Sequence, residues 1–402
     1  MIIGEINAFY GMLFFCDVGI MIRVKKMYYL KHFDENLLSF DMFYDERGFG
    51  VENITLLSDE SLLPIELMLN KEGLVRFIKH RIIPKNRAYA DKILAQLGLN
   101  HNNLKGIIDI SKGLSLNDSY WIAEESFDKS FASINLFENR FSRTLSFLAF
   151  TGNSSGSVKG LSSSPELTTN GQLAKGWRRI DGKIFLYKSG TSGFANAGLE
   201  PYSEFYASQI AEAMGVNHVE YGLAKWKHKL CSTCTLFTSI DLSFVPMGYI
   251  VPSGGMAAVM EYLSKLGKSF YEPFLDMLTF DAIILNTDRH YGNFGLLIDS
   301  KSNKPVAFAP LFDNGAGLLP YAMDEDELSS KEKLSVYLKS RTPAAYDSFL
   351  GLAKKYMGKS QREKIRNLLD FHFKKHARYN LSDKRLKILE EVVKNQAIEL
   401  LK

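Results

Sequence analysis

A segment rich in glycine and serine constrains the fold of this chain more than any other feature. Nine of the fourteen residues from Thr151 to Ser164 are Gly or Ser. Because such a segment cannot bury an apolar core, it is typical of a flexible connection between folded parts. A length of 402 residues is also enough for two or three domains. We therefore expect an N-terminal extension (1–26), an α+β subdomain (27–150), a linker (151–164) and a second folded part from residue 165 onward.

The composition excludes several classes of protein. Apolar residues make up 46% of the chain and charged residues 23%, which excludes disordered, collagen-like and disulfide-framework proteins. An odd number of cysteines, three, is usual in a reducing compartment, so we expect a cytoplasmic protein. The net charge of +4 is too small to indicate a nucleic-acid partner from bulk electrostatics.

The first residues do not have the order of a secretory signal. The apolar run 6–22 is followed by the basic run 23–26, whereas a signal peptide has its basic residues first. We expect translation to start at Met21 or Met27 and expect no membrane partner. A short membrane anchor is the alternative interpretation.

Residues 71–92 carry seven lysines or arginines and only two acidic residues. They would form either a patch for nucleic acid or an acidic partner, or a solvated helical face. Because no specificity motif accompanies the charge, the solvated face is favoured, and nucleic acid is expected to bind only weakly or indirectly. Apolar residues at helical spacing predict a helix that follows a capping Asn86 and stops at Gly98.

After the linker, the pattern changes to a hairpin followed by helices. An Asp181-Gly182 turn between two strand-like runs (178–187) is a strong hairpin signal. An amphipathic helix is predicted over 204–214, closed by Gly215, and an apolar helix over about 270–285. The chain is predicted to be helical from residue 329, with a last helix from Asp383. We therefore expect an α+β, protein-kinase-like, two-lobed fold with a small β-rich lobe (165–237) and a mainly helical lobe (238–402).

Three polar residues in the second part carry the chemistry. Asp288 is followed five residues later by Asn293, and Asp313 follows an apolar strand after a further twenty residues. A hairpin over 295–299 and 306–311 would return Asp313 toward the loop of the other two. One carboxylate would orient an attacking hydroxyl, while an amide oxygen and a second carboxylate would hold Mg²⁺ against the phosphates of ATP. The alternative is that these residues only make turn bonds and cap a helix.

A phosphotransferase also needs groups that bind the nucleotide. Lys188 ends the predicted hairpin, and Glu204 begins the following helix as its expected ion-pair partner. The loop from Thr168 to Gly176 would cover the phosphates with backbone N–H groups near Gly171. Backbone groups of Thr235 to Phe237, at the end of an apolar strand, would bind the adenine.

Residues 286–294 together with 311–313 resemble the catalytic loop and metal-binding segment of the HipA-like kinases, a family of bacterial serine/threonine protein kinases. The family pattern Asn-x-Asp-x-His-x-x-Asn-Phe is matched by five residues: Asn286, Asp288, His290, Asn293 and Phe294. The resemblance implies that Asp288 is the catalytic residue, with His290 in the same loop, and that Asn293 and Asp313 bind Mg²⁺. It covers about residues 165–400.

The resemblance also implies cofactors and partners. It implies ATP as the nucleotide, held by Lys188 with Glu204 and by the loop lysine Lys175, which ends the stretch Gly171-Gln172-Leu173-Ala174-Lys175 where the family usually has Gly-x-Gln-x-Lys. A protein would be the substrate, and an antitoxin would be the partner if the chain is the toxin of a toxin–antitoxin pair. The inhibitory serine of the family's loop is replaced here by Thr168 and Thr169.

Two other functions and three weaker signals stay open. Asp288, His290 and Asn293 are also similar to the catalytic loop of phosphoinositide kinases, which predicts a lipid or small-molecule kinase. A non-catalytic partner- or DNA-associated regulator working through residues 71–92 is the other alternative. Cys231 and Cys234 are favoured as buried strand thiols over metal ligands. His372 and His376 are favoured as polar positions on one helical face. The acidic run 324–327 is favoured as a helix N-terminus over a substrate-binding segment.

Overall fold

The computed structural model describes residues 26–154, 156, 163–193 and 195–402. The apolar run 6–22, the expected start site Met21 and half of the Gly/Ser segment (155 and 157–162) lie outside these residues. No helix in the described ranges has the length and apolar character needed to cross a membrane.

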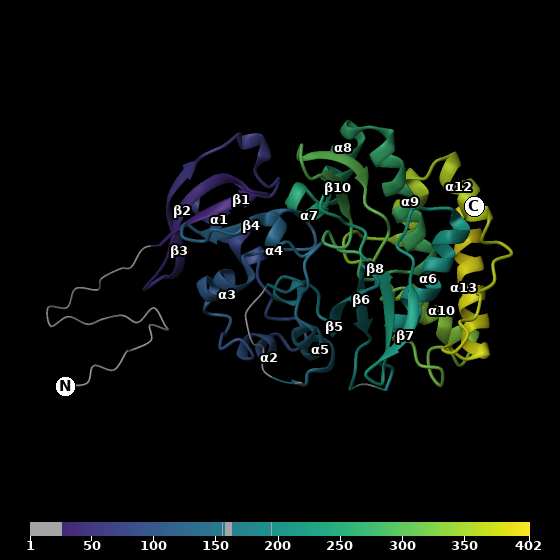
Figure 1. Cartoon of the computed structure of the whole chain (residues 1–402). Coiled ribbons are helices and arrows are strands. Elements are labelled where there is room, and N and C mark those ends of the chain that lie inside the picture. The colour runs from purple at the N-terminus through teal and green to yellow at the C-terminus, as the bar shows by residue number, and fades with distance from the viewer. Residues whose placement is uncertain (1–25, 155, 157–162, 194) are drawn as a thin grey trace, which may run out of the picture.

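The N-terminal subdomain is built on an antiparallel sheet with strand order β3-β2-β1-β4 (Figure 1). Its strands are β1 (Lys26–His32), β2 (Glu35–Asp45), β3 (Gly48–Leu56) and β4 (Tyr120–Glu124). Its helices are α1 (Lys71–His80), α2 (Ala90–Ala95), α3 (Leu104–Ser111), α4 (Phe131–Ile134) and α5 (Arg143–Thr151). Alternate residues of β1 face the core, so Tyr28 and Leu30 are buried. The side chain of Asn70 caps α1 by accepting from the N–H of Gly73 at 2.7 Å.

The second part begins with another antiparallel sheet, of order β5-β6-β8-β7. Its elements are β5 (Lys175–Ile180), β6 (Lys183–Ser189), α6 (Glu200–Met214), β7 (Gly222–Trp226) and β8 (Lys229–Thr235). The predicted hairpin turn is confirmed, because Asp181 (φ 48°) and Gly182 (φ 79°) both adopt the left-handed conformation of a type I′ turn. Helix α6 ends at Gly215 (φ 64°) as predicted but begins at Glu200, four residues earlier, because Pro201 fits its first turn.

The third part is mainly helical. A small antiparallel sheet of order β11-β10-β9 consists of β9 (Leu242–Pro246), β10 (Gly295–Asp299) and β11 (Lys304–Phe308). The helices are α7 (Met247–Ile250), α8 (Gly255–Leu266), α9 (Lys268–Ile284), α10 (Lys331–Lys339), α11 (Phe349–Tyr356), α12 (Lys359–Arg366) and α13 (Asp383–Leu401). Helix α9 is buried along most of its length, since it contacts α8, α11, α12 and α13. The expected α+β class, with a β-rich lobe before a helical lobe, is confirmed.

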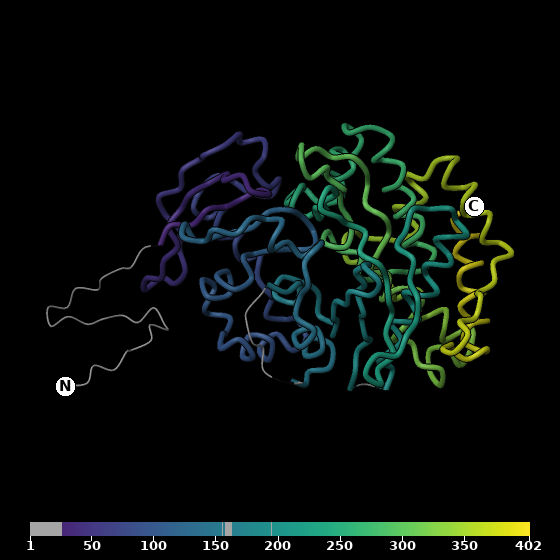
Figure 2. The backbone as a smooth tube through the Cα atoms, viewed as in Figure 1, coloured from purple at the N-terminus to yellow at the C-terminus, as the bar shows by residue number. Residues whose placement is uncertain are grey.

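The three parts follow one another in space as they do in the sequence. Figure 2 shows the N-terminal subdomain at one end, the β5–β8 sheet in the middle and α13 at the other end. An apolar cluster joins the first two parts, because Trp121 and Leu136 of the subdomain share it with Ile184 of β6. The linker division at 151–164 stays a prediction.

The predicted cap in the basic segment 71–92 was wrong, whereas the favoured solvated face holds for five of its seven basic residues, which are exposed: Lys71, Arg76, Lys79, Lys85 and Lys92. Helix α2 begins at Ala90 with Tyr89 (φ 62°) at its N-cap, so Asn86 does not cap it. The residues before it instead form a turn that docks on the second part, where the N–H of Ala88 donates to the carbonyl of Gln172. Arg81 and Arg87 are 5% and 3% exposed, so these two charges belong neither to a binding patch nor to a solvated face.

The C-terminal region is less helical than predicted. Residues 340–348 and 367–382 are irregular and interrupt the helices. His372 and His376 lie in the second of these segments, so they do not share a helical face as predicted. The ring of His376 instead accepts from the N–H groups of Arg378 and Tyr379 and fixes a local turn. The last helix is as predicted, with Leu386, Leu389, Val393 and Leu400 buried.

Candidate active site

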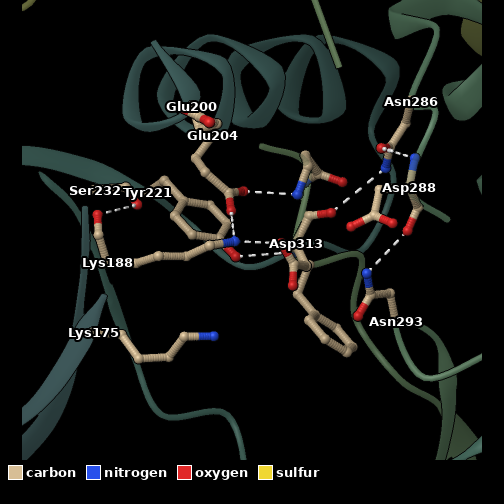
Figure 3. Close-up of polar contacts among 12 residues, drawn as sticks. Lys175, Lys188, Glu200, Glu204, Tyr221, Ser232, Asn286, Asp288, Asn293 and Asp313 are labelled. Atoms are coloured by element: carbon tan, nitrogen blue, oxygen red, sulfur yellow. Dashed lines mark hydrogen bonds and ion pairs between the residues drawn. The ribbon is translucent and has the colours of Figure 1, made fainter. Parts of the chain in front are cut away.

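Lys188, Glu204 and Asp313 meet in one cluster although they come from three segments. Lys188 lies near the end of β6, Glu204 lies on α6 and Asp313 follows β11 (Figure 3). The ammonium Nζ of Lys188 lies 2.9 Å from Oε1 of Glu204 and also forms an ion pair with Oδ1 of Asp313. The structure therefore brings together the lysine, its helix partner and the second acidic residue that the sequence singled out.

The charges of this cluster stabilise one another. Burial opposes ionisation of Asp313, but the positive charges of Lys188 and Lys175 outweigh it and lower the pKa of Asp313 to about 2. Burial likewise disfavours the ammonium of Lys188, and the carboxylates of Asp313 and Glu204 reverse this and raise its pKa. Both groups are therefore charged throughout the physiological pH range.

The backbone around Asp313 is held in an unusual conformation. Asp313 has φ 55°, which is uncommon for a residue other than glycine. Its N–H donates to the hydroxyl of Tyr221 at 3.1 Å, and the N–H of Asn314 donates to Oε2 of Glu204 at 2.8 Å. These bonds fix the Asp313 carboxylate toward Lys188, as expected where surrounding contacts impose a strained conformation at a functional site.

The loop after α9 places the other two predicted residues beside this cluster (Figure 3). Asn286 is fully buried, and its Oδ1 accepts from the N–H of Asp288 at 3.2 Å. Asn293 donates from Nδ2 to the carbonyl of Asp288 at 3.0 Å. The side chain of Asp288 remains exposed, although partial desolvation, opposed by the charge of His290, raises its pKa. Asp288 is therefore accessible to a substrate while its backbone is fixed on both sides.

His290 shows only a local contact. Its Nδ1 accepts from the N–H of Gly292 at 3.0 Å, and the residue is exposed. This bond shapes the loop, so a catalytic part for His290 stays a prediction.

Arg289 organises the site, although no pattern in the sequence singled it out. It is 0% exposed and forms a two-pronged ion pair with Asp281 of α9, at 2.9 and 3.0 Å. Its remaining N–H groups donate to the carbonyls of Asn293 (2.9 Å) and Phe312 (2.6 Å) and to Oδ1 of Asn314 (2.7 Å). One guanidinium thus ties α9 to both the Asp288 loop and the Asp313 segment.

The loop that precedes β5 carries a buried lysine. Gly171 has φ 91°, a backbone conformation that favours glycine, and a Cβ there would lie 2.3 Å from Nζ of Lys175, which would have to move. Nζ of Lys175 donates to the carbonyl of Asn170 at 2.9 Å. Burial, together with the nearby charge of Lys188, lowers the pKa of Lys175 to about 7. In Figure 3, Lys175 points toward the cluster of Lys188 and Asp313.

Arg87 of the N-terminal subdomain holds both ends of this loop. Its guanidinium donates to the carbonyls of Glu166 and Thr169 on one side and of Lys175 on the other, the last two at 3.3 and 3.2 Å. Burial, partly opposed by Glu166, lowers the pKa of Arg87 to about 10, so it remains charged. The loop conformation therefore depends on a residue from outside the second part of the chain.

The hydroxyls of the two loop threonines are engaged within the protein. Thr168 donates to the carbonyl of Leu114 at 2.8 Å. Thr169 donates to the carbonyl of Pro165 at 2.6 Å and accepts from the indole of Trp177 at 2.8 Å. Phosphorylation of either would first require these bonds to break.

The expected adenine-binding stretch lies where β8 leaves its sheet. Thr235 is exposed at the end of β8, and Phe237 follows in a cluster with Phe244 and Phe312, with ring centroids 5.5 and 5.3 Å away. Phe312 directly precedes Asp313 in the chain, so this apolar wall adjoins the charged cluster. The structure does not oppose the prediction that a base lies here.

Cys231 and Cys234 lie in β8 as free thiols, Cys231 buried and Cys234 partly buried. The thiol of Cys231 donates to the carbonyl of Ala224 at 3.2 Å. Over the described part of the chain, no group of three or more His, Cys, Asp or Glu side chains is arranged to hold a metal ion. Both cysteines are therefore thiols within a strand, as the sequence predicted, although Cys234 is only partly buried.

The oxygens near Asp313 fit Mg²⁺ nevertheless. Nδ2 of Asn293 is used by Asp288, which leaves Oδ1 of Asn293 for a cation, and Oδ2 of Asp313 is not the atom paired with Lys188. Mg²⁺ usually takes one or two protein carboxylates or amides and completes its shell with water and phosphate oxygens. Asn293 and Asp313 could therefore hold it only together with a bound nucleotide.

The prediction for the acidic run 324–327 was wrong. Helix α10 begins at Lys331, so the run does not form its first turn. Asp324 instead pairs with Arg385 of α13 at 2.6 Å, and Asp326 pairs with Lys333 at 2.9 Å. The run therefore attaches the segment after the site to the helical lobe.

Comparisons with known proteins point to protein kinases. No family model matches the chain. A stretch of 137 residues is 32% identical to the serine/threonine-protein kinase CtkA of Helicobacter pylori, which corresponds to 31% of this chain and 42% of that protein. Part of this chain is related to a serine/threonine protein kinase. The match spans less than half of the length of CtkA.

Two solved structures are similar at lower identity. The crystal structure of the H. pylori proinflammatory kinase CtkA matches 56% of this chain and 91% of its own, with a TM-score of 0.44 and 19% identity. The complex of the Shewanella oneidensis toxin–antitoxin proteins HipA and HipB with operator DNA includes a chain that matches 94% of this one and 96% of its own, with a TM-score of 0.48 and 12% identity.

Proposed function

We propose that this protein is an ATP- and Mg²⁺-dependent protein kinase that phosphorylates serine or threonine. The observation that carries the proposal is the ion-paired cluster of Lys188, Glu204 and Asp313 directly beside the loop of Asp288 and Asn293. Such a cluster supplies the cation for the nucleotide, the metal-binding oxygens and an accessible carboxylate within one site. The related stretch of CtkA supports the same class of reaction.

In this proposal, each group has a defined part. Lys188, held by Glu204, binds the α- and β-phosphates, while the loop around Gly171 and Lys175 covers them. Asn293 and Asp313 hold Mg²⁺, which neutralises the negative charge of the phosphates. The Asp288 carboxylate orients the substrate hydroxyl and accepts its proton, so the protein contributes mainly position and charge.

Asp288→Asn tests this assignment. The variant keeps the size of the side chain but cannot accept the proton, so phosphate transfer should fall by about 100-fold or more, within the range of general-base effects. Binding of ADP should stay near the parent value. Asp241→Asn, in an exposed ion pair with Lys301, is the matched control and should leave transfer unchanged. Transfer from labelled ATP to a protein extract, with phosphosite mapping, is the readout.

Transfer by Asp288→Asn at the parent rate would refute the proposal. Labelling of lipid instead of protein, when vesicles are supplied, would also refute it.

A finer proposal is that the chain is the toxin of a toxin–antitoxin pair, with an antitoxin protein as partner. Its support is the resemblance of residues 286–294 to the HipA-like loop. If it holds, expression of the parent should arrest bacterial growth and expression of Asp288→Asn should not.

A further inference from the structure

A cleft lies between the N-terminal subdomain and the β9–β10 sheet. It encloses about 750 Å³, including its open mouth. One wall comes from residues 64–66, α1 and residues 115–120, and the other comes from β9, Tyr249 of α7 and residues 298–303. None of the residues assigned to catalysis or to the metal lines it. This cleft therefore has no part in the proposed reaction.

The walls of the cleft are joined by hydrogen bonds that do not depend on a ligand. Asn303 donates from Nδ2 to the carbonyls of Ser61 and Leu63 at 3.0 and 2.7 Å. The N–H of Phe244 donates to the carbonyl of Asn117 at 2.7 Å. The N-terminal subdomain and the helical lobe are thus fixed to each other on both sides of the cleft, so the space is preformed.

Three buried polar atoms along the cleft have no hydrogen-bond partner. They are Oε2 of Glu66, Nδ1 of His80 and Nε of Arg81. The first two are 3.6 Å apart, and Arg81 is only 5% exposed. Buried polar atoms are almost always paired in folded proteins. Of the three, Oε2 of Glu66 and Nε of Arg81 are the two atoms that a polar ligand in the cleft could complete.

The charges around the cleft define the ligand further. Asp118 is neutralised by Arg81, which donates to both of its carboxylate oxygens at 2.6 and 2.7 Å. The carboxylate of Glu66 is held only by charge, because its Oε2 lies 3.6 Å from Nδ1 of His80, too far for a hydrogen bond. It therefore offers its oxygens to two adjacent donors, while Nε–H of Arg81 requires an acceptor. A guanidinium ligand would satisfy Glu66 but not Arg81, because it has no acceptor and carries a like charge.

Flat rings line the same space. The ring of Tyr249 stacks on His80, with centroids 4.6 Å apart and planes at 9°. Phe77, Tyr120 and Phe244 also face the cleft. Such surfaces favour a planar ligand. Guanine combines the required groups: a ring N–H next to an exocyclic amine on one edge, and O6 and N7 as acceptors on another.

We propose that this cleft binds a 2-amino-substituted planar heterocycle of the guanine type, with Glu66 accepting from its two adjacent N–H donors and Arg81 donating to its acceptor edge. None of the residues assigned to catalysis or to the metal lines this site. It adjoins the expected nucleotide site, however, since Thr168 and Asn170 of the phosphate loop and Phe244 of the apolar wall also line the cleft.

Calorimetry with guanosine on the full chain, with the ATP site saturated by ADP and Mg²⁺, tests the proposal. Guanosine should bind, and inosine, which lacks the 2-amino group, should bind at least about tenfold more weakly. Glu66→Gln should weaken guanosine binding by roughly tenfold to hundredfold, the range for loss of a charge-assisted hydrogen bond pair. Because Oε2 of Glu66 accepts no hydrogen bond within the protein and its ion pair with His80 is long, at 3.6 Å, this variant should melt close to the parent temperature.

Lys188→Met separates this proposal from the kinase proposal. It removes the cation of the ATP site, so it should abolish ADP binding and leave guanosine binding unchanged. No guanosine binding, equal binding of guanosine and inosine, equal binding by Glu66→Gln, or displacement of guanosine by ADP would each overturn the proposal. Stronger binding of methylguanidinium than of guanosine would also overturn it, in favour of an arginine side chain.

Discussion

Lys175 should make nucleotide binding depend on pH. Its ammonium is buried beside Lys188, and these two effects lower its pKa to about 7. In the free protein, Lys175 is therefore mostly neutral above neutral pH. Phosphate oxygens placed under the loop would favour the charged form, so nucleotide binding should be accompanied by uptake of one proton at Nζ.

The size of the effect follows from the two pKa values. Suppose that the bound nucleotide returns the pKa of Lys175 to its ordinary value of 10.5. The change in affinity with pH then follows from the fraction of Lys175 that is protonated in the free protein and in the nucleotide complex. Between about pH 7 and about pH 9, the dissociation constant should then rise by about fiftyfold. This value is an upper bound, because a lower pKa of Lys175 in the complex would end the rise at a lower pH. The sign is fixed: affinity falls as pH rises through the pKa of the free lysine.

Calorimetric titration with ADP and Mg²⁺ over this pH range, in two buffers of different ionisation enthalpy, measures both the slope and the proton count. Starting near pH 7 limits the contribution of the nucleotide's own phosphate groups. Lys175→Met should bind more weakly at neutral pH and lose the slope. Lys183→Met, at an exposed position in the same hairpin, is the matched control and should keep it. A slope that survives in Lys175→Met would refute the reasoning.

Two further predictions concern stability. Arg289→Met should lower the free energy of unfolding by about 3–5 kcal/mol, because it leaves Asp281 charged and buried without a partner, and adding Asp281→Leu should restore part of it in urea unfolding. Equal stability of Arg289→Met and the parent would contradict this. Burial raises the pKa of Glu166 in the folded protein. Stability should therefore fall as the pH rises above about 4.5, the pKa of this carboxyl in the unfolded chain. Glu166→Gln, which can still accept from the N–H of Trp177, should therefore gain stability relative to the parent between about pH 4 and pH 7, and a constant difference would contradict this.

The sequence predicted those parts of the site that local patterns determine. The Asp181-Gly182 turn forms because its two residues accept positive φ, and the hairpin then carries Lys188 to the end of its strand. The apolar character of α9 and of the following hairpin brings Asp288 and Asp313 to one side of the helical lobe. Each of these steps depends on neighbours within about thirty residues.

The sequence could not show which charges are buried. Arg289 stands in a polar loop and has the pattern of an exposed residue, yet its partners come from α9, from its own loop and from the segment after β11. Arg81 and Arg87 stand in a basic run and were interpreted as part of a solvated face. A buried charge requires partners from distant segments, and spacing along the chain carries no record of them.

The positions of Arg87 and Thr168 show that the N-terminal subdomain is part of the construction of the site. Arg87 donates to carbonyls at both ends of the phosphate loop, and the hydroxyl of Thr168 donates back to Leu114 of the subdomain. The hydroxyl of Thr238, just after β8, donates to Leu116 in the same way. Because both the loop and the stretch expected to hold the base are bonded to the subdomain, a shift of the subdomain would move both surfaces that are proposed to enclose the nucleotide. The Gly/Ser-rich segment therefore divides the chain in sequence, while the geometry of the site depends on residues from both sides of it.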